Sequence, residues 1–154
     1  MYVSYCGPFL VAMALLVGCG DSGKDPVSSG APSPAADNIL RGDYAVVSGE
    51  DLDEIAQMGG SSFLITGNLT IQNSDLTDLT GLEALTGVGG DLEISNNEIL
   101  LSLRGLENLA TITGFLSIGS NANLRDLDSL GKLRSIGSFL SLGFNSSLTD
   151  IDGL

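Results

Sequence analysis

The residues that could do chemistry in this chain are few, and their types restrict the reactions available. The 154-residue sequence contains no histidine, so the commonest general base and the commonest transition-metal ligand are both missing. Serine and aspartate without histidine form no ordinary hydrolase triad. We therefore predict no catalytic residue, no metal site and no cofactor.

Two pairs of aspartates are candidate ligands for a cation. Asp126 and Asp128 form one pair, and Asp150 and Asp152 form the other. Each pair brackets a leucine or isoleucine that we expect to point inward, so the carboxylates should point outward into solvent. We interpret both pairs as solvated residues, and a shared cation is the alternative.

The overall charge excludes some classes of partner. Lysine and arginine total 6, whereas aspartate and glutamate total 19, which gives a net charge of −13. Nucleic acids and anionic membrane surfaces attract basic patches, so we expect no nucleic-acid partner. Both cysteines, Cys6 and Cys19, lie within the first twenty residues, so no disulfide can stabilise the rest of the chain.

The N-terminus carries a predicted export signal. Residues 9–17, FLVAMALLV, form an apolar run that is typical of a secretory signal and too short to span a bilayer. The run ends in Leu16-Val17-Gly18-Cys19, which resembles the bacterial lipobox. This resemblance implies cleavage before Cys19 and attachment of fatty acids such as palmitate to that residue. We expect a signal peptide over 1–18 and a lipid anchor at Cys19, with an ordinary cleaved signal as the alternative.

A linker is predicted after the anchor. Residues 20–42 are rich in Gly, Ser, Pro and Asp and contain few apolar residues that could offset the entropy of ordering. We therefore expect a lipid-anchored flexible linker over 19–42. In Gram-negative lipoproteins an aspartate directly after the cysteine favours retention in the inner membrane. Glycine stands there in this chain, at Gly20, which favours the outer membrane or cell surface.

The remainder of the chain is an internal repeat. A Leu-x-Ile or Leu-x-Leu triplet begins at Leu69, Leu92, Leu116 and Leu140, at intervals of 23, 24 and 24 residues. An asparagine-bearing corner follows each triplet, and apolar residues then recur at every third position. Such residues would slip about 60° per step around an α-helix, so a helix cannot bury them together. A coil with stacked parallel strands can, and we predict a mainly β solenoid of about 24-residue repeats over 43–154.

The repeat is preceded by a predicted cap. Ser48 and Asp51 resemble a capping box, and Leu52 and Ile55 lie on one face of the helix that would follow. We expect this short helix, stopped by Gly59-Gly60, to close the N-terminal end of the solenoid. At the other end the sequence stops in mid-repeat at Leu154, so that either the chain is a fragment or its open end pairs with another chain.

The repeat resembles a known family. The segments ITGNLTI, GGDLEISNNEILLSLRGLENLATITGFLSI and GSFLSLGFNSSLTDIDGL are similar to the receptor L-domain, a relative of leucine-rich repeats, over residues 42–154. The resemblance implies a right-handed, β-helix-like solenoid. It also implies an extracellular role in binding partners or building surfaces, without catalysis. The chain lacks the disulfides of the animal receptors, so their ligands are not carried over.

One face of the predicted solenoid is the candidate binding face. Its outward strand positions are Thr70, Glu93, Ser117 and Ser141. Phe115 and Phe139 occupy matching places beside it, either as a platform for a ligand or as a cover for the edge of the coil.

The combined prediction is a cell-envelope lipoprotein of a bacterium. It would present its solenoid for recognition of a protein or glycan, or as a structural surface component, and its lipid would hold it to the membrane. The alternative function is a β-helix enzyme acting on surface polysaccharides. Such an enzyme requires clustered carboxylates or basic residues on one sheet, where this sequence places only Glu93.

Overall fold

The computed structural model describes residues 38–154. The predicted signal peptide, the lipidated Cys19 and the linker up to residue 37 lie outside the described residues. The described chain is mainly β, with one α-helix and one turn of 3₁₀ helix. The elements are β1 Asn38–Leu40, β2 Tyr44–Val46, α1 Gly49–Gly59, β3 Phe63–Ile65, β4 Leu69–Gln72, β5 Leu85–Val88, β6 Leu92–Ser95, β7 Thr111–Ile112, β8 Leu116–Gly119, η1 Asp128–Leu130, β9 Ser135–Ile136 and β10 Leu140–Gly143.

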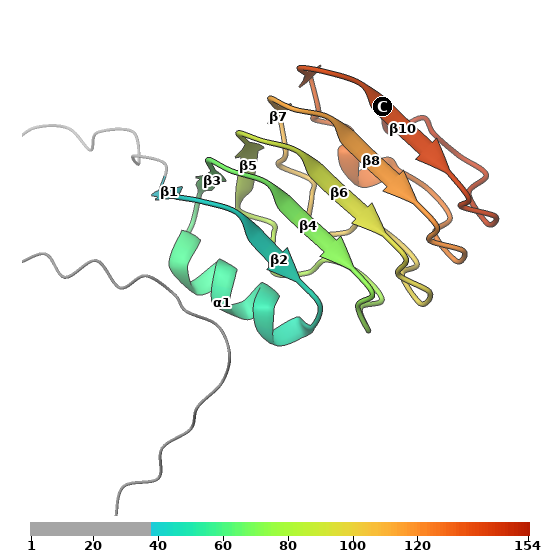
Figure 1. Cartoon of the computed structure of the whole chain (residues 1–154), viewed down its shortest axis with the longest axis horizontal. Helices are drawn as coiled ribbons and strands as arrows, with labels where there is room; N and C mark the ends of the chain where they lie inside the picture. The colour runs from blue at the N-terminus through green and yellow to red at the C-terminus, as the bar shows by residue number, and fades with distance from the viewer. Residues whose placement is uncertain (1–37) are drawn as a thin grey trace, which may run out of the picture. The chain divides into compact units, whose positions relative to one another are not determined.

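The strands form two parallel sheets of five strands each (Figure 1). The first sheet has the order β1-β3-β5-β7-β9, and the second has the order β10-β8-β6-β4-β2. Consecutive strands therefore lie in different sheets, and each strand pairs with the strand one repeat away. The two sheets and their connections enclose one continuous core of aliphatic side chains and Phe63.

The register of the second sheet confirms the predicted alignment of the repeats. Leu69 pairs with Leu92, Leu92 with Leu116, and Leu116 with Leu140. The third residue of each triplet pairs in the same way, so equivalent side chains stack above one another. Those of β4, β6 and β8 are buried in the core, whereas Leu140 in the outer strand β10 is 41% exposed, so its predicted burial is wrong. Because strand side chains alternate in direction, the residues between them face outward.

The first sheet was not predicted, and it revises the interpretation of the apolar series. Val88 and Ile112, the last members of two series, are buried but also lie in strands β5 and β7. The sheet begins earlier than the predicted domain. Leu40 is only 8% exposed and pairs with Ile65, so the predicted linker over 19–42 is wrong for residues 38–40. A buried side chain and ladder hydrogen bonds hold that segment in the fold.

Apolar residues at every third position are buried in most of the repeats but not at the C-terminal end of the domain. The apolar positions from Leu76 to Leu130 are buried. In the last repeat Ile151 is 56% exposed and Leu154 is 45% exposed, so their predicted inward placement is wrong. Strands β9 and β10 are the outer strands of their sheets, and no further strand of the described chain packs over these two side chains.

Asparagines connect neighbouring repeats through the core. The backbone N–H of Asn97 donates to Oδ1 of Asn121 at 3.1 Å, and that of Asn121 donates to Oδ1 of Asn145 at 2.9 Å. The side-chain amide of Asn121 also donates to the Ile94 carbonyl at 2.9 Å. Asn97 and Asn121 are fully buried, and no buried side-chain nitrogen or oxygen within residues 38–154 lacks a partner. These corner asparagines therefore bond the backbones of adjacent repeats together.

Gly105 occupies a position that only glycine fits. Its φ is +113°, a region that L side chains rarely adopt. A Cβ atom there would collide with the carbonyl oxygen of Leu79 in the preceding repeat. The close approach of the two backbones thus depends on the missing side chain.

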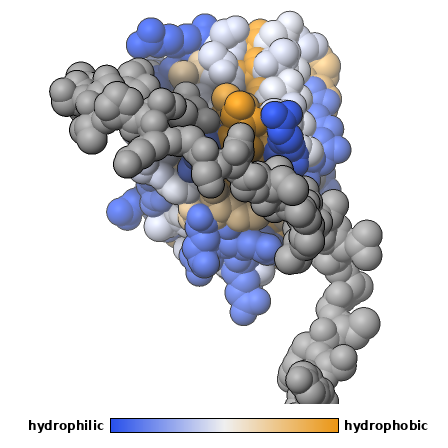
Figure 2. Space-filling view, turned by 90° about the vertical axis from the view of Figure 1, so that its left-hand side faces the viewer, coloured by the Kyte–Doolittle hydropathy of each residue, from blue (hydrophilic) through white to orange (hydrophobic). Residues whose placement is uncertain are grey.

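Helix α1 lies at the end of the sheets that carries β1 and β2 (Figure 1). Leu52 and Ile55 are buried, as the spacing predicts, and Gly60 ends the helix. Viewed onto this end, the surface shows hydrophilic residues along its lower margin, where α1 lies, and hydrophobic residues above them (Figure 2). The helix buries Leu52 and Ile55 and exposes Asp53 and Glu54, which agrees with its predicted capping role.

Asp51 organises the start of the helix. The backbone N–H groups of Val47 and Ser48 each donate to its Oδ2 atom at 2.9 Å, and the Ser48 hydroxyl donates to the same atom at 3.0 Å. The bond from the Val47 N–H is the main cause that lowers the pKa of Asp51 below its ordinary value of 3.8, and partial burial opposes it. The carboxylate also lies at the positive end of the helix dipole.

Replacing Asp51 by asparagine should remove a pH-dependent contribution to stability. At pH 7 we expect Asp51→Asn to lower the free energy of unfolding by about 0.5–1 kcal/mol, because an uncharged amide is a weaker cap. The folded-state pKa is depressed, so the carboxylate stabilises the fold above pH 3.8 and this contribution is lost as the pH falls through the folded-state pKa. Urea unfolding at pH 7, 5 and 3 should show the wild-type advantage shrinking only at pH 3. An equal loss in Asp53→Asn, an exposed residue of the same helix, would contradict this role.

Candidate functional site

The predicted face residues lie together on the outer side of the second sheet. Thr70 pairs with Glu93, Glu93 with Ser117, and Ser117 with Ser141, so the four positions form one row across β4, β6, β8 and β10. A second row two residues on consists of Gln72, Ser95, Gly119 and Gly143.

The two rows form the outer surface of the second sheet, which we call the second-sheet face. Its side chains are small or polar. The Ser95 hydroxyl donates to Oε1 of Glu93 at 3.1 Å, so the one carboxylate of the two rows is held by its neighbour. Gly119 and Gly143 add no side chain, and the face has no bulky residue between its edges. Such a regular, open surface can lie against an extended ligand but does not enclose one.

Phe115 and Phe139 are stacked at the start of strands β8 and β10. Their ring centroids are 5.0 Å apart and the ring planes differ by 14°. Phe139 is 56% exposed, so much of this residue is accessible to solvent. The structure therefore brings the two rings together, as their matching positions in the repeat suggested.

Polar residues occupy the equivalent position in earlier repeats. Oδ1 of Asp43 accepts from the Asn68 N–H at 2.7 Å, Oδ1 of Asn68 from the Asp91 N–H at 2.8 Å, and Oδ1 of Asp91 from the Phe115 N–H at 3.0 Å. At this edge of the sheet, a row of hydrogen-bonded polar residues is thus followed by the two stacked phenylalanines. The change of chemistry from polar to aromatic is specific to the last two repeats.

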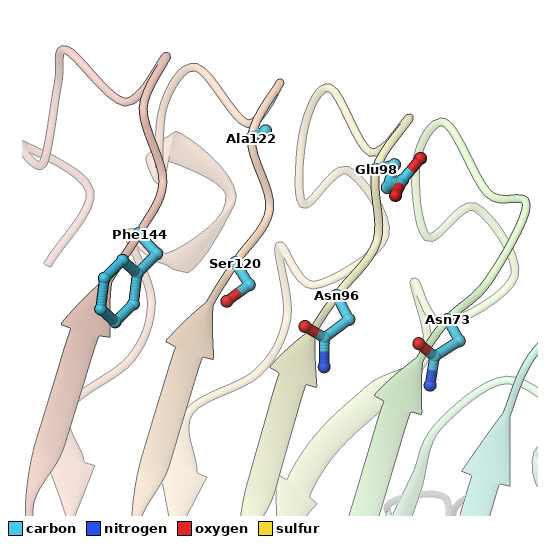
Figure 3. Close-up of a pocket in the computed structure, with 6 residues that line it drawn as sticks. All are labelled: Asn73, Asn96, Glu98, Ser120, Ala122 and Phe144. Atoms are coloured by element: carbon cyan, nitrogen blue, oxygen red, sulfur yellow. The ribbon is translucent and has the colours of Figure 1, made fainter.

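A groove that the sequence did not predict runs across the opposite ends of the same strands. It has a volume of about 460 Å³, and we call it the corner groove (Figure 3). Its lining residues are Asn73, Asn96, Glu98, Ser120, Ala122 and Phe144.

The backbone at the corner groove is unusual. The residue that follows each strand has a positive φ, with 51° at Asn73, 57° at Asn96, 56° at Ser120 and 57° at Phe144. Asparagine tolerates this left-handed conformation, but a bulky aromatic residue adopts it rarely. Phe144 is also 90% exposed. Aligning the repeats on their strands places Phe144 at the position of Asn73 and Asn96, and this was the available signal in the sequence.

The aspartate pairs are accounted for by local turns. Oδ1 of Asp126 accepts from the Asp128 N–H at 3.4 Å, and Oδ1 of Asp150 accepts from the Asp152 N–H at 2.8 Å. Asp78 makes the same bond to Thr80, whose hydroxyl and N–H lower the pKa of Asp78. No three metal-ligating side chains form a group within residues 38–154. The first aspartate of each pair thus shapes a turn.

Comparisons with known proteins found no relative of this chain. No protein-family model matches the chain, and neither the curated proteins nor the solved structures include a match. Among residues 38–154 there is no helix with the length and apolar character needed to cross a membrane.

Proposed function

We propose that this protein is a bacterial cell-envelope lipoprotein that presents a repeat domain for recognition of a protein or glycan. The lipobox-like sequence around Cys19 supports anchoring in the membrane, with the outer membrane or cell surface as the location. In this proposal the chain has no catalytic role.

We further propose that the repeat domain is a right-handed β-helix-like solenoid of the receptor L-domain type. The alternation of successive strands between two parallel sheets supports this. So does the pairing of equivalent residues 23 or 24 positions apart. Stacked units of this kind offer long, regular surfaces to partners.

The observation that carries the recognition function is the second-sheet face with its stacked phenylalanines. Thr70, Glu93, Ser117 and Ser141 stand in one row, and the exposed ring of Phe139 flanks it. An exposed aromatic residue beside polar groups provides both contact area and hydrogen bonds for a ligand.

An enzyme acting on polysaccharides is the alternative function. Its chemistry calls for two carboxylates about 5–10 Å apart that flank the bond to be cleaved. The outward rows of the second sheet contain one, Glu93, which bonds to Ser95. Turnover of any polysaccharide by the purified protein would favour the enzyme over the recognition module.

Removing both rings should weaken ligand binding. We expect the Phe115→Ala/Phe139→Ala double variant to bind ligands at least about tenfold more weakly than wild type, since each ring loses its contact area. The measurement is a glycan array and a pull-down of surface proteins with residues 19–154 carrying Cys19→Ser, which prevents acylation.

The matched control is Leu101→Ala/Ile151→Ala, which truncates two exposed apolar residues away from the second sheet. Circular dichroism should confirm that both double variants remain folded. Equal binding by wild type and the phenylalanine variant would exclude the rings as a platform, and an absence of any ligand would count against the recognition function.

A further inference from the structure

We infer that the corner groove is a binding site for a neutral, extended oligosaccharide, with Phe144 as the stacking residue. This inference rests on the proposed recognition function and names the class of ligand. It assigns a site separate from the second-sheet face, at the ends of the strands and away from Phe115 and Phe139.

The first argument is the strained, exposed aromatic residue. Phe144 holds a left-handed backbone conformation, with φ of 57°, where the equivalent residues of two earlier repeats are asparagines. Its side chain is 90% exposed, so it gains little from packing in the core. Strain of this kind persists where function favours it, and the exposed ring is suited to stack on another flat, apolar surface.

The second argument is that the polar side chains of the groove form no hydrogen bonds with other described residues and can therefore bond to a ligand. The amides of Asn73 and Asn96, the Ser120 hydroxyl and the Glu98 carboxylate make no side-chain hydrogen bond to another residue within 38–154. The buried asparagines one position on, by contrast, are bonded to their neighbours. In Figure 3 Ser120 lies next to Phe144, Asn96 and Asn73 follow at the ends of the next two strands, and Glu98 lies on the loop beyond Asn96. These polar side chains can donate to and accept from the hydroxyls of a ligand.

The third argument is the shape and charge of the groove. Asn73, Asn96, Ser120 and Phe144 directly follow four neighbouring strands, so the row extends about 14 Å across three strand spacings. None of the six lining residues is basic and one is acidic, which disfavours an anionic ligand. The groove also lacks the enclosed apolar pocket that anchors a protein partner. A pyranose chain fits these conditions, because each ring has an apolar C–H face and a rim of hydroxyls.

The test is titration of the Cys19→Ser protein, residues 19–154, with cellotetraose, maltotetraose and chitotetraose, followed by NMR chemical-shift changes and calorimetry. At least one neutral tetrasaccharide should bind and shift the amide signals of Asn96 and Phe144. Phe144→Asn should weaken this binding about tenfold. It should not destabilise the fold, because it restores the residue that the equivalent backbone positions carry. Phe144→Tyr should retain binding, and Asn96→Ser should weaken it.

Several results would overturn the inference. These are no binding of any neutral tetrasaccharide, equal binding by Phe144→Asn, or tighter binding of tetragalacturonate than of the neutral probes. Ile151→Ala is the control, since it removes an exposed apolar side chain outside both the groove and the second-sheet face and should leave the titration unchanged. If the array and pull-down show ligands whose binding depends on Phe115 and Phe139 but not on Phe144, the recognition function stands and only the groove assignment fails.

Discussion

Replacing Asn121 by alanine is expected to lower the free energy of unfolding by about 3–5 kcal/mol, because buried polar groups lose their partners. Oδ1 of Asn121 accepts from both the backbone N–H and the side-chain amide of Asn97, at 3.1 and 3.0 Å. Its own amide donates to the Ile94 carbonyl at 2.9 Å. Alanine would leave these groups unpaired in the core, where water does not reach them. A second penalty comes from the cavity left by the amide.

The measurement is urea unfolding monitored by far-ultraviolet circular dichroism. Asn123→Ala is the matched control, because the Asn123 amide also bonds to the adjacent repeat, at the Glu98 carbonyl, but is exposed. We expect the control to lose less than about 1 kcal/mol, the usual net value of an exposed hydrogen bond. Similar losses in the two variants would show that the buried row of asparagines does not stabilise the repeat beyond ordinary surface bonds.

Replacing Cys19 by serine is expected to move the protein from the membrane fraction to the soluble fraction. Each methylene group of an acyl chain buried in the bilayer contributes about 0.8 kcal/mol. One chain gives reversible binding, whereas two or more chains hold a protein stably. The hydroxyl of serine is not the thiol that the lipidation reaction requires, so all of the proposed chains would be lost together.

Fractionation of cells and labelling with radioactive palmitate measure this effect. Cys6→Ser is the matched control, since it changes the other cysteine of the chain, which lies inside the predicted signal peptide. The control should remain labelled and bound to the membrane. Retention of the Cys19→Ser protein in the membrane fraction, or a wild-type protein without label, would contradict the lipid anchor.

The second sheet could be predicted from the sequence because its signal is local and repeated. Leu92 and Ile94 alternate with Glu93, and the same pattern returns at Leu116 one period later. The first sheet could not be predicted in this way. Strand β7 contains only Thr111 and Ile112, too few residues to display alternation. Its pairing depends on where the neighbouring repeats place their backbones, which no single segment of sequence encodes.

The candidate site could likewise be predicted only in part. The row from Thr70 to Ser141 and the approach of Phe115 to Phe139 follow from equal spacing, so both could be predicted. The corner groove could not, because it depends on the left-handed backbone of residues such as Phe144. In the last repeat the corner asparagine is Asn145, which is bonded to the Ile118 carbonyl, and the exposed phenylalanine stands one position before it. The asparagine pattern in the sequence therefore indicates Asn145 and not Phe144.

The row of buried asparagines has a consequence for how this molecule can change in evolution. Its hydrogen bonds join residues separated by 23 to 27 positions, as from Ser74 to Asn97 and from Asn121 to Ile94. Duplication or deletion of a whole unit preserves every such separation, whereas a single inserted residue between Asn97 and Asn121 offsets all the bonds that span it. The gene is therefore free to grow or shrink in steps of one period, and each step changes the length of the sheet stack by about 4.8 Å.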